Sequence, residues 1–242
     1  MSDLVASIRE RYLMTLAAIA SAAKKAGREP ESVKLVVVTK SQPVEIVRAA
    51  IEAGAKILGE NYAEEGVMKL QSLREFSAVE WHMIGHVQSR KAQLVAANFN
   101  LMHSLDSLKL AKRLDRFSGE AGRQLPVLLE FNVGGEESKG GWPAWDEAHW
   151  GGLLGDVAEM LALPHLTVRG LMTMPPLGST ADFSRPFFQR LRRLQEFLSR
   201  QFPQADFSEL SMGTSSDFEA AVEEGATFVR VGTAIVGARN YQ

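Results

Sequence analysis

Short apolar runs rich in β-branched residues alternate along the chain with stretches in which apolar residues recur every three or four positions. The first run, 33–38, is typical of a strand buried on both faces, and the periodic stretch 44–52 is typical of a helix that ends at Gly54. This pairing recurs to the end of the chain. The pattern predicts strands at 33–38, 56–58, 80–84, 100–103, 126–132, 165–171, 207–211 and 228–231, helices between them, and one further helix over 2–26.

Regular alternation of strands and helices predicts a parallel sheet of the α/β class. Eight repeats favour closure of this sheet into a (β/α)8 barrel of the TIM type. The alternative is an open doubly wound sheet, which usually carries a glycine-rich first turn, whereas residues 39–43 contain no glycine. Since no linker interrupts the pattern, we expect residues 1–242 to form a single domain, with a helix over 1–27 packed on the barrel.

Composition removes several classes of protein. The 242 residues are 45% hydrophobic and contain no cysteine, which excludes disulfide frameworks, thiol catalysis and cysteine-ligated metal sites. A net charge of -2 gives no electrostatic footprint for nucleic acid. Neither a membrane span nor a signal peptide is evident in the sequence. We therefore expect a soluble cytoplasmic protein, and a monomer, because no long exposed apolar stripe is evident.

The carboxyl end of the first predicted strand carries a lysine, Lys40. In a barrel this position projects into the mouth, where chemistry is normally located. Partial desolvation there favours the neutral amine, a nucleophile that forms Schiff bases with carbonyl compounds. The alternative is a solvated loop lysine.

Small and hydroxyl-bearing residues follow the last two predicted strands. They occupy 211–217 after the seventh strand and continue with Gly232 and Thr233 after the eighth. Barrels commonly bind phosphate in these two loops, although residues 216–219 also fit a helix capping box that needs no ligand. With Lys40, this pattern indicates a phosphorylated aldehyde, for which pyridoxal 5′-phosphate and the substrate of a sugar-phosphate aldolase are both suitable.

Several motifs resemble those of the pyridoxal phosphate homeostasis proteins. They lie at 38–43 (VTKSQP), 59–62 (GENY), 81–85 (WHMIG), 137–141 (ESKGG), 169–174 (RGLMTM), 210–213 (LSMG) and 229–239 (VRVGTAIVGAR). That family is similar in fold to the N-terminal barrel of the alanine racemases and lacks their second, β-rich domain. Two departures are Thr214, where the family more often has an apolar residue, and the Trp-rich segment 142–152, which we expect to pack over a barrel end.

The resemblance implies roles for individual residues. Lys40 would carry pyridoxal 5′-phosphate as an internal aldimine, and Asn61 would line the pocket beside it. The phosphate would be held by Ser211, Gly213, Gly232 and Thr233. Arg230 would face the pyridine nitrogen; because a guanidinium stays protonated, the ring nitrogen would stay unprotonated and the ring would be a weak electron sink.

These features favour a binding protein that takes part in the homeostasis of free pyridoxal 5′-phosphate and passes it to apoenzymes that need it. No strong catalytic activity is expected. The alternative is an enzyme, either a racemase or decarboxylase with the same cofactor or a phospho-sugar aldolase that uses Lys40. Tyr62 and Tyr241 are the only plausible phenolic bases, and neither has an evident partner.

Other polar residues have less specific interpretations. His82 and His103 lie within apolar strands, as hydrogen-bonded core or pocket-wall histidines do. His86 is placed to reach a ligand at the mouth. Glu60 is the weakest candidate, a general base without an evident partner, and Lys139 lies in a loop that can approach the cofactor or partner anions.

Overall fold

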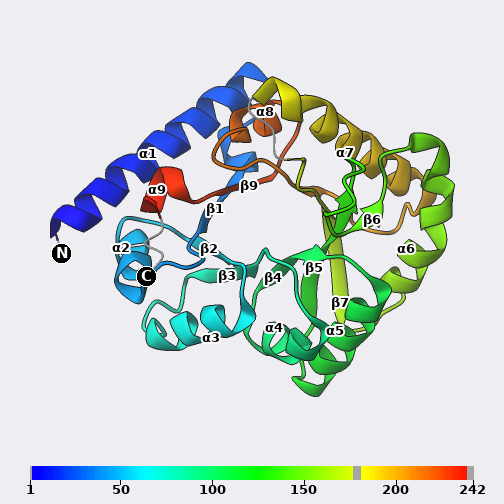
Figure 1. Cartoon of the computed structure of the whole chain (residues 1–242), viewed down its shortest axis with the longest axis horizontal. Helices are drawn as coiled ribbons and strands as arrows, with labels where there is room; N and C mark the ends of the chain where they lie inside the picture. Colours follow the sequence, from blue (N-terminus) through cyan, green and yellow to red (C-terminus); the bar gives the residue numbers. More distant parts are fainter. Residues whose placement is uncertain (1, 177–180, 239–242) are drawn as a thin grey trace.

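A computed structural model describes residues 2–176 and 181–238. Its main sheet is a closed parallel barrel, because the order β4-β3-β2-β1-β9-β8-β7-β5 is joined into a ring by a further pairing of β4 with β5 (Figure 1). The barrel strands are β1 (Lys34–Val38), β2 (Ile57–Glu60), β3 (Glu80–Met83), β4 (Leu101–Leu105), β5 (Leu125–Asn132), β7 (Leu166–Met172), β8 (Glu209–Ser211) and β9 (Phe228–Val231). The predicted eight-stranded α/β barrel is confirmed.

Helices form a ring outside the barrel (Figure 1). They are α2 (Val44–Glu52), α3 (Ala63–Ser72), α4 (Ala92–Asn98), α5 (Leu108–Glu120), α6 (Leu154–Leu161), α7 (Ala181–Gln201), α8 (Phe218–Glu223) and α9 (Thr233–Val236), with short 3-10 turns at Pro30–Ser32, Ser89–Lys91 and Glu147–Leu153. The first helix, α1 (Ser2–Lys25), packs along α2, α8 and α9. Within the described residues, no helix combines the length and apolarity needed to cross a bilayer.

The apolar core has two parts. The larger part lies between the strands and the surrounding helices. The smaller part is inside the barrel and includes Val36, Leu128, Met172 and Phe228. The barrel interior also holds buried polar side chains, among them His82, His103, Ser211 and Arg230.

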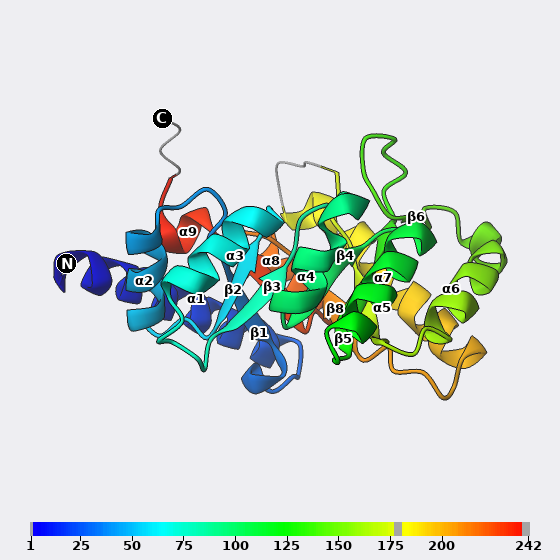
Figure 2. The same cartoon turned by 90° about the horizontal axis from the view of Figure 1, so that it is seen from below.

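The Trp-rich segment differs from the expectation that it covers a barrel end. Trp142 belongs to a two-residue strand, β6 (Trp142–Pro143), that pairs with the end of β5, and its indole Nε1 donates to Asp156 on α6. Trp150 is buried with its ring 5.6 Å from that of Phe197 on α7. Both rings therefore pack beside the barrel, while Trp145 is half exposed. The loop between β5 and β6 stands out above the barrel in Figure 2, at the opposite end of the view from α9.

Candidate functional site

A cavity of about 660 Å³ opens at the carboxyl ends of the barrel strands. Its polar wall comes from loops and strand ends far apart in the sequence: Lys40, Asn61, His86, Asp106, Glu130, Ser138, Lys139, Thr214, Ser215, Arg230 and Thr233. Of the predicted site residues, five line this cavity, namely Lys40, Asn61, Arg230, Gly232 and Thr233. The parallel barrel explains this convergence, because it brings the ends of all its strands to one rim.

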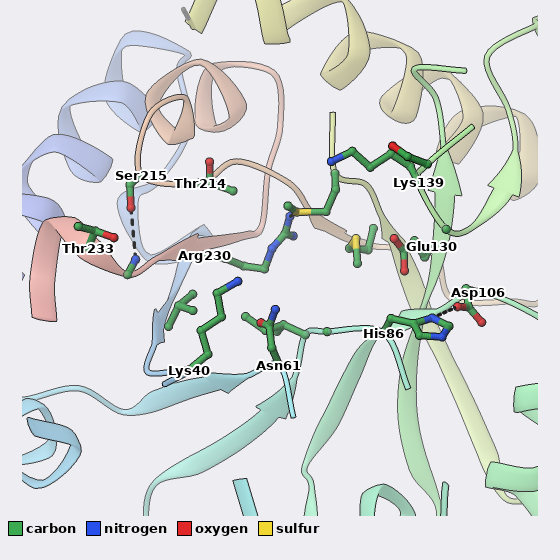
Figure 3. A pocket seen from close by; sticks show the side chains of 18 residues that line it. Lys40, Asn61, His86, Asp106, Glu130, Lys139, Thr214, Ser215, Arg230 and Thr233 are labelled. Carbon is green, nitrogen blue, oxygen red and sulfur yellow. Dashed lines mark hydrogen bonds and ion pairs between the residues drawn. The ribbon is translucent and has the colours of Figure 1, made fainter. Parts of the chain in front are cut away.

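Lys40 follows β1 and is half-buried. Its side chain extends into the middle of the cavity, toward Arg230 and beside Asn61 (Figure 3). The main chain just before it is tied to the next strand, because the Thr39 amide donates to the Gly59 carbonyl over 3.0 Å. An amine is thus presented at the centre of the mouth.

One end of the cavity is lined by hydroxyl groups. Thr214 and Ser215 come from the loop after β8, and Thr233 and Gly232 follow β9 (Figure 3). The Gly232 amide donates to Ser215 Oγ over 3.3 Å, which joins the two loops. This end can therefore offer hydroxyl and backbone N–H donors to an anion.

The expected capping box at 216–219 is wrong. The helix α8 begins at Phe218, and the side chain of its cap residue Asp217 makes no capping bond. Instead Asp217 Oδ1 accepts from the Thr214 amide over 2.7 Å and from the Thr214 hydroxyl over 3.1 Å. Asp217 thus holds the loop after β8 in place instead of capping α8.

Ser211 and Gly213 do not lie on the cavity wall. The buried Ser211 hydroxyl contacts His103 Nδ1 at 2.7 Å and accepts from the Arg230 guanidinium. The Gly213 carbonyl accepts from the Arg230 amide over 3.0 Å. These two residues support the wall from behind, and the hydroxyl groups that face the cavity in this loop are those of Thr214 and Ser215.

Arg230 brings a buried cation to the cavity. Its Nη2 donates to the Thr173 carbonyl over 3.0 Å and lies 2.9 Å from Met174 Sδ, while Nη1 donates to Ser211. Burial lowers the pKa of Arg230 to about 10, against the opposing effect of Glu130 and Asp217. The guanidinium therefore remains charged at neutral pH, and its hydrogen bonds to Ser211 and Thr173 fix its orientation.

A chain of hydrogen bonds runs from Arg230 through the barrel interior. His103 Nε2 lies 2.9 Å from His82 Nδ1, and His82 Nε2 lies 3.1 Å from Glu80 Oε2 at the other end of the barrel. Burial lowers the pKa of His82 and brings that of His103 well below its usual value, so both rings are neutral. The interpretation of these histidines as hydrogen-bonded core residues is confirmed.

The direction of this chain follows from its two ends. A guanidinium only donates and an ionised carboxylate only accepts. We therefore infer that the Ser211 hydroxyl donates to His103 Nδ1. His103 then donates from Nε2–H to His82 Nδ1, and His82 donates from Nε2–H to Glu80. Each ring is held in one tautomer.

The wall opposite the hydroxyl groups carries two carboxyl groups, Asp106 and Glu130, together with His86 and Lys139 (Figure 3). His86 Nδ1 lies 2.7 Å from Asp106 Oδ2. Burial raises the pKa of Glu130 to about 7, and the Asp106 carboxylate acts in the same direction, while Arg230, His86 and Lys139 oppose the shift. Asp106 and Glu130 could not be selected from the sequence, since their significance depends on burial and on their proximity to each other. His86 and Lys139 do line the cavity.

The candidate bases are located elsewhere or are already paired. Glu60 is fully buried, accepts from Thr39 Oγ1 and is ion-paired with Lys69, which corrects its interpretation as an unpartnered general base. Tyr62 is 57% exposed and lies outside this cavity. Tyr241, like Arg239 of the last motif, lies outside the described residues. Across 2–176 and 181–238, no His, Asp and Glu side chains group as metal ligands would.

Known proteins with the same fold show which class of barrel this is. The family model described as alanine racemase, N-terminal domain, matches residues 14–240. An alanine racemase from Clostridium difficile 630 superposes with a TM-score of 0.68 at 16% identity, over 95% of this chain and 56% of that one. That likeness concerns the fold alone, and the chain is thus a barrel of the alanine racemase N-terminal type.

More similar relatives narrow the identification. The pyridoxal phosphate homeostasis protein of Vibrio alginolyticus is 44% identical over 222 residues, 90% of this chain and 91% of that protein. The one from Escherichia coli K12 is 39% identical, over 92% and 93% of the two chains. PipY of Synechococcus elongatus PCC7942, solved with PLP bound, superposes with a TM-score of 0.81 at 36% identity, over 95% of this chain and all of that one. The chain belongs to the pyridoxal phosphate homeostasis protein family, as its motifs predict.

Proposed function

We propose that this protein binds pyridoxal 5′-phosphate in the barrel mouth, holds it as a Schiff base on Lys40, and takes part in the homeostasis of the free cofactor. One observation carries the proposal: a lysine amine and a hydroxyl-lined pair of loops share a single cavity. The family membership and the PLP-bound structure of PipY support the choice of cofactor.

The residues present fit the chemical groups of that cofactor. Its aldehyde needs an amine, which Lys40 offers, with Asn61 beside it. Its phosphate needs hydrogen-bond donors, which the exposed Ser215 and Thr233 offer beside Gly232; the Thr214 amide and hydroxyl already donate to Asp217. When bound, the cofactor supplies an electron sink, and a guanidinium at its ring nitrogen weakens that sink. We assign this position to Arg230, whose charge persists at neutral pH.

We further propose that the protein is a carrier without strong catalytic activity, monomeric and cytoplasmic, that passes the cofactor to apoenzymes. The exposure of Ser215, Thr233 and His86 at the mouth supports exchange, because a ligand there can leave without unfolding of the barrel. A solution mass of 26.6 kDa would match one chain, and twice that value would contradict the monomer.

A second candidate function is proton transfer on an amino acid, as in a racemase. The raised pKa of Glu130 favours it, since a carboxyl group that titrates near 7 can exchange protons at neutral pH. Against it, the Tyr62 phenol lies outside the cavity. A phospho-sugar aldolase using Lys40 is the third and weakest alternative.

Visible absorption of purified wild type and Lys40→Ala with added pyridoxal 5′-phosphate tests the proposal. We expect an imine band in the wild type and none in the variant. The same samples are then assayed with a panel of amino acids for loss of chirality and with sugar phosphates for cleavage. Robust turnover that disappears in Lys40→Ala would overturn the carrier in favour of an enzyme, and a colourless wild type that cleaves sugar phosphates would favour the aldolase.

A further inference from the structure

A buried ion cluster lies behind Lys40, outside the cavity wall. Its centre is Lys69 on α3, which is 1% exposed. The Lys69 ammonium donates to the Thr39 carbonyl over 2.6 Å, to Glu60 Oε1 over 2.8 Å and to Glu65 Oε1 over 2.5 Å. Since an ammonium has three N–H donors, these three acceptors use all of them. No charged member of the cluster lines the cavity.

The cluster holds the main chain on both sides of Lys40. On one side, the Thr39 carbonyl accepts a hydrogen bond from the Lys69 ammonium, and the Thr39 hydroxyl donates to Glu60 Oε1 over 2.6 Å. On the other, the Ser41 amide donates to Glu65 Oε1 over 2.6 Å. Ser41 has φ +57, in the left-handed region that L residues seldom adopt, so its conformation needs an external restraint.

Burial of these charged groups has a desolvation cost, so their presence here needs an explanation. Burial raises the pKa of Glu60, against the effect of Lys69, and its Oε2 has no hydrogen-bond partner among the described residues. Replacing a buried ion pair by apolar side chains of similar volume is often neutral or stabilising. Stability alone therefore does not account for a buried lysine here, whereas fixing the 39–41 turn does.

We propose that Lys69, together with Glu65, is a positioning residue that sets the main chain of Lys40 for reaction with an aldehyde. This inference rests on the proposed function. In that reaction, Lys40 Nζ attacks the carbonyl carbon, a C=N bond replaces the C=O bond, and the carbonyl oxygen leaves as water with the two protons that were on the neutral amine. The cluster takes no part in this step itself. It fixes the main chain at Lys40 beforehand and so sets the direction of the Lys40 side chain.

The test compares two ligands that differ only at the reacting group. Pyridoxal 5′-phosphate forms an imine, whereas pyridoxine 5′-phosphate keeps the ring and phosphate but has an alcohol in place of the aldehyde. In Lys69→Met and Glu65→Ala we expect the rate of imine formation to fall about tenfold or more, because small misplacements of a reacting group are costly. The affinity for pyridoxine 5′-phosphate should stay at the wild-type value.

Two further variants sharpen the result. Glu64→Ala is the matched control, since Glu64 is the neighbouring residue on α3, is exposed, and pairs with Lys91. It should change neither the imine rate nor the affinity. Glu65→Gln keeps an acceptor for the Ser41 amide and should recover most of the imine rate lost in Glu65→Ala.

Each outcome decides the proposal. A wild-type imine rate in Glu65→Ala would overturn it, as would an equal loss for both ligands, which would mean that the cluster only supports the fold. If Lys69→Met does not fold, the comparison of Glu65→Ala with Glu65→Gln decides, because the Glu65 side chain is 22% exposed and tolerates replacement better. A wild type that forms no imine contradicts the proposed function instead.

Discussion

At the scale of single residues, Glu130 shows how position controls charge in the cavity. Burial beside Asp106 raises its pKa to about 7 from an ordinary value of 4.5. A carboxyl group with a raised pKa binds protons more tightly in the folded chain than in the unfolded one. Its contribution to stability is therefore greatest in acid and is lost as the pH rises through about 7.

Glu130→Gln removes this pH dependence and keeps the shape of the side chain. Relative to the wild type, we expect the variant to gain about 1–3 kcal/mol in free energy of unfolding between pH 5 and pH 8, in the absence of ligand. Urea unfolding at the two pH values measures the gain. Glu137→Gln, on an exposed loop residue, is the control, and an identical pH response of the two variants would contradict the assignment.

The same residues show what sequence reasoning can reach. Lys40, Gly232 and Thr233 could be placed at the cavity because each follows a predicted strand, whereas Asn61 and Arg230 were assigned from the resemblance of their motifs to the family. Ser211 and Gly213 lie in the same run as Thr214 and Ser215, and only the path of the loop separates those behind the wall from those that face the cavity. Glu130 and Lys69 could not be recognised, since their significance arises from burial and from partners in other elements.

At the scale of elements, the loop between β8 and α8 depends on Gly213. Its φ is +91, and a Cβ there would lie 2.5 Å from the Ala221 Cβ and 2.9 Å from the Phe218 Cα. These contacts are with the body of α8, which cannot move aside without shifting the loop that carries Thr214 and Ser215. The glycine thus lets the strand and helix approach closely enough to form one end of the cavity.

Gly213→Ala should therefore lower both stability and cofactor affinity. We expect a loss of about 2–4 kcal/mol in free energy of unfolding, the sum of a strained φ and a steric overlap. Gly225→Ala is the control at the other end of α8: its φ is +105, but the nearest atom to a new Cβ is Arg192 Cδ at 3.6 Å. That variant should lose only about 1 kcal/mol. Equal losses in chemical denaturation would show that the close approach at Gly213 does not matter.

The strands were predictable as elements because each is a short apolar run with buried faces, such as β1 and β9. The strand β6 was not, because two residues carry no period and its existence depends on pairing with β5. The capping box failed for a similar reason. Its side chains matched the local pattern, but α8 begins at Phe218, so the cap position falls on Asp217 and not on Ser216.

At the scale of the whole molecule, a chain of hydrogen bonds through the barrel interior connects the two ends of the barrel. Glu80 lies at the amino end of β3, and the chain His82, His103 and Ser211 leads from it to Arg230 at the mouth. The guanidinium is held in one orientation because Nη1 donates to Ser211 and Nη2 donates to the Thr173 carbonyl. The amine of Lys40, which follows β1, and the guanidinium of Arg230 on β9 thus lie at the mouth on two neighbouring strands of the ring.

The Schiff base on Lys40 is tested most directly by finding which lysine reacts with the cofactor. Two lysines line the cavity, Lys40 and Lys139. Borohydride reduction of the wild-type protein loaded with pyridoxal 5′-phosphate, followed by digestion and mass spectrometry of the peptides, separates them. We expect the reduced label on the peptide that contains Lys40 and no label there in Lys40→Ala. A label on Lys139 with Lys40 unmodified, or no label on either lysine, would contradict it.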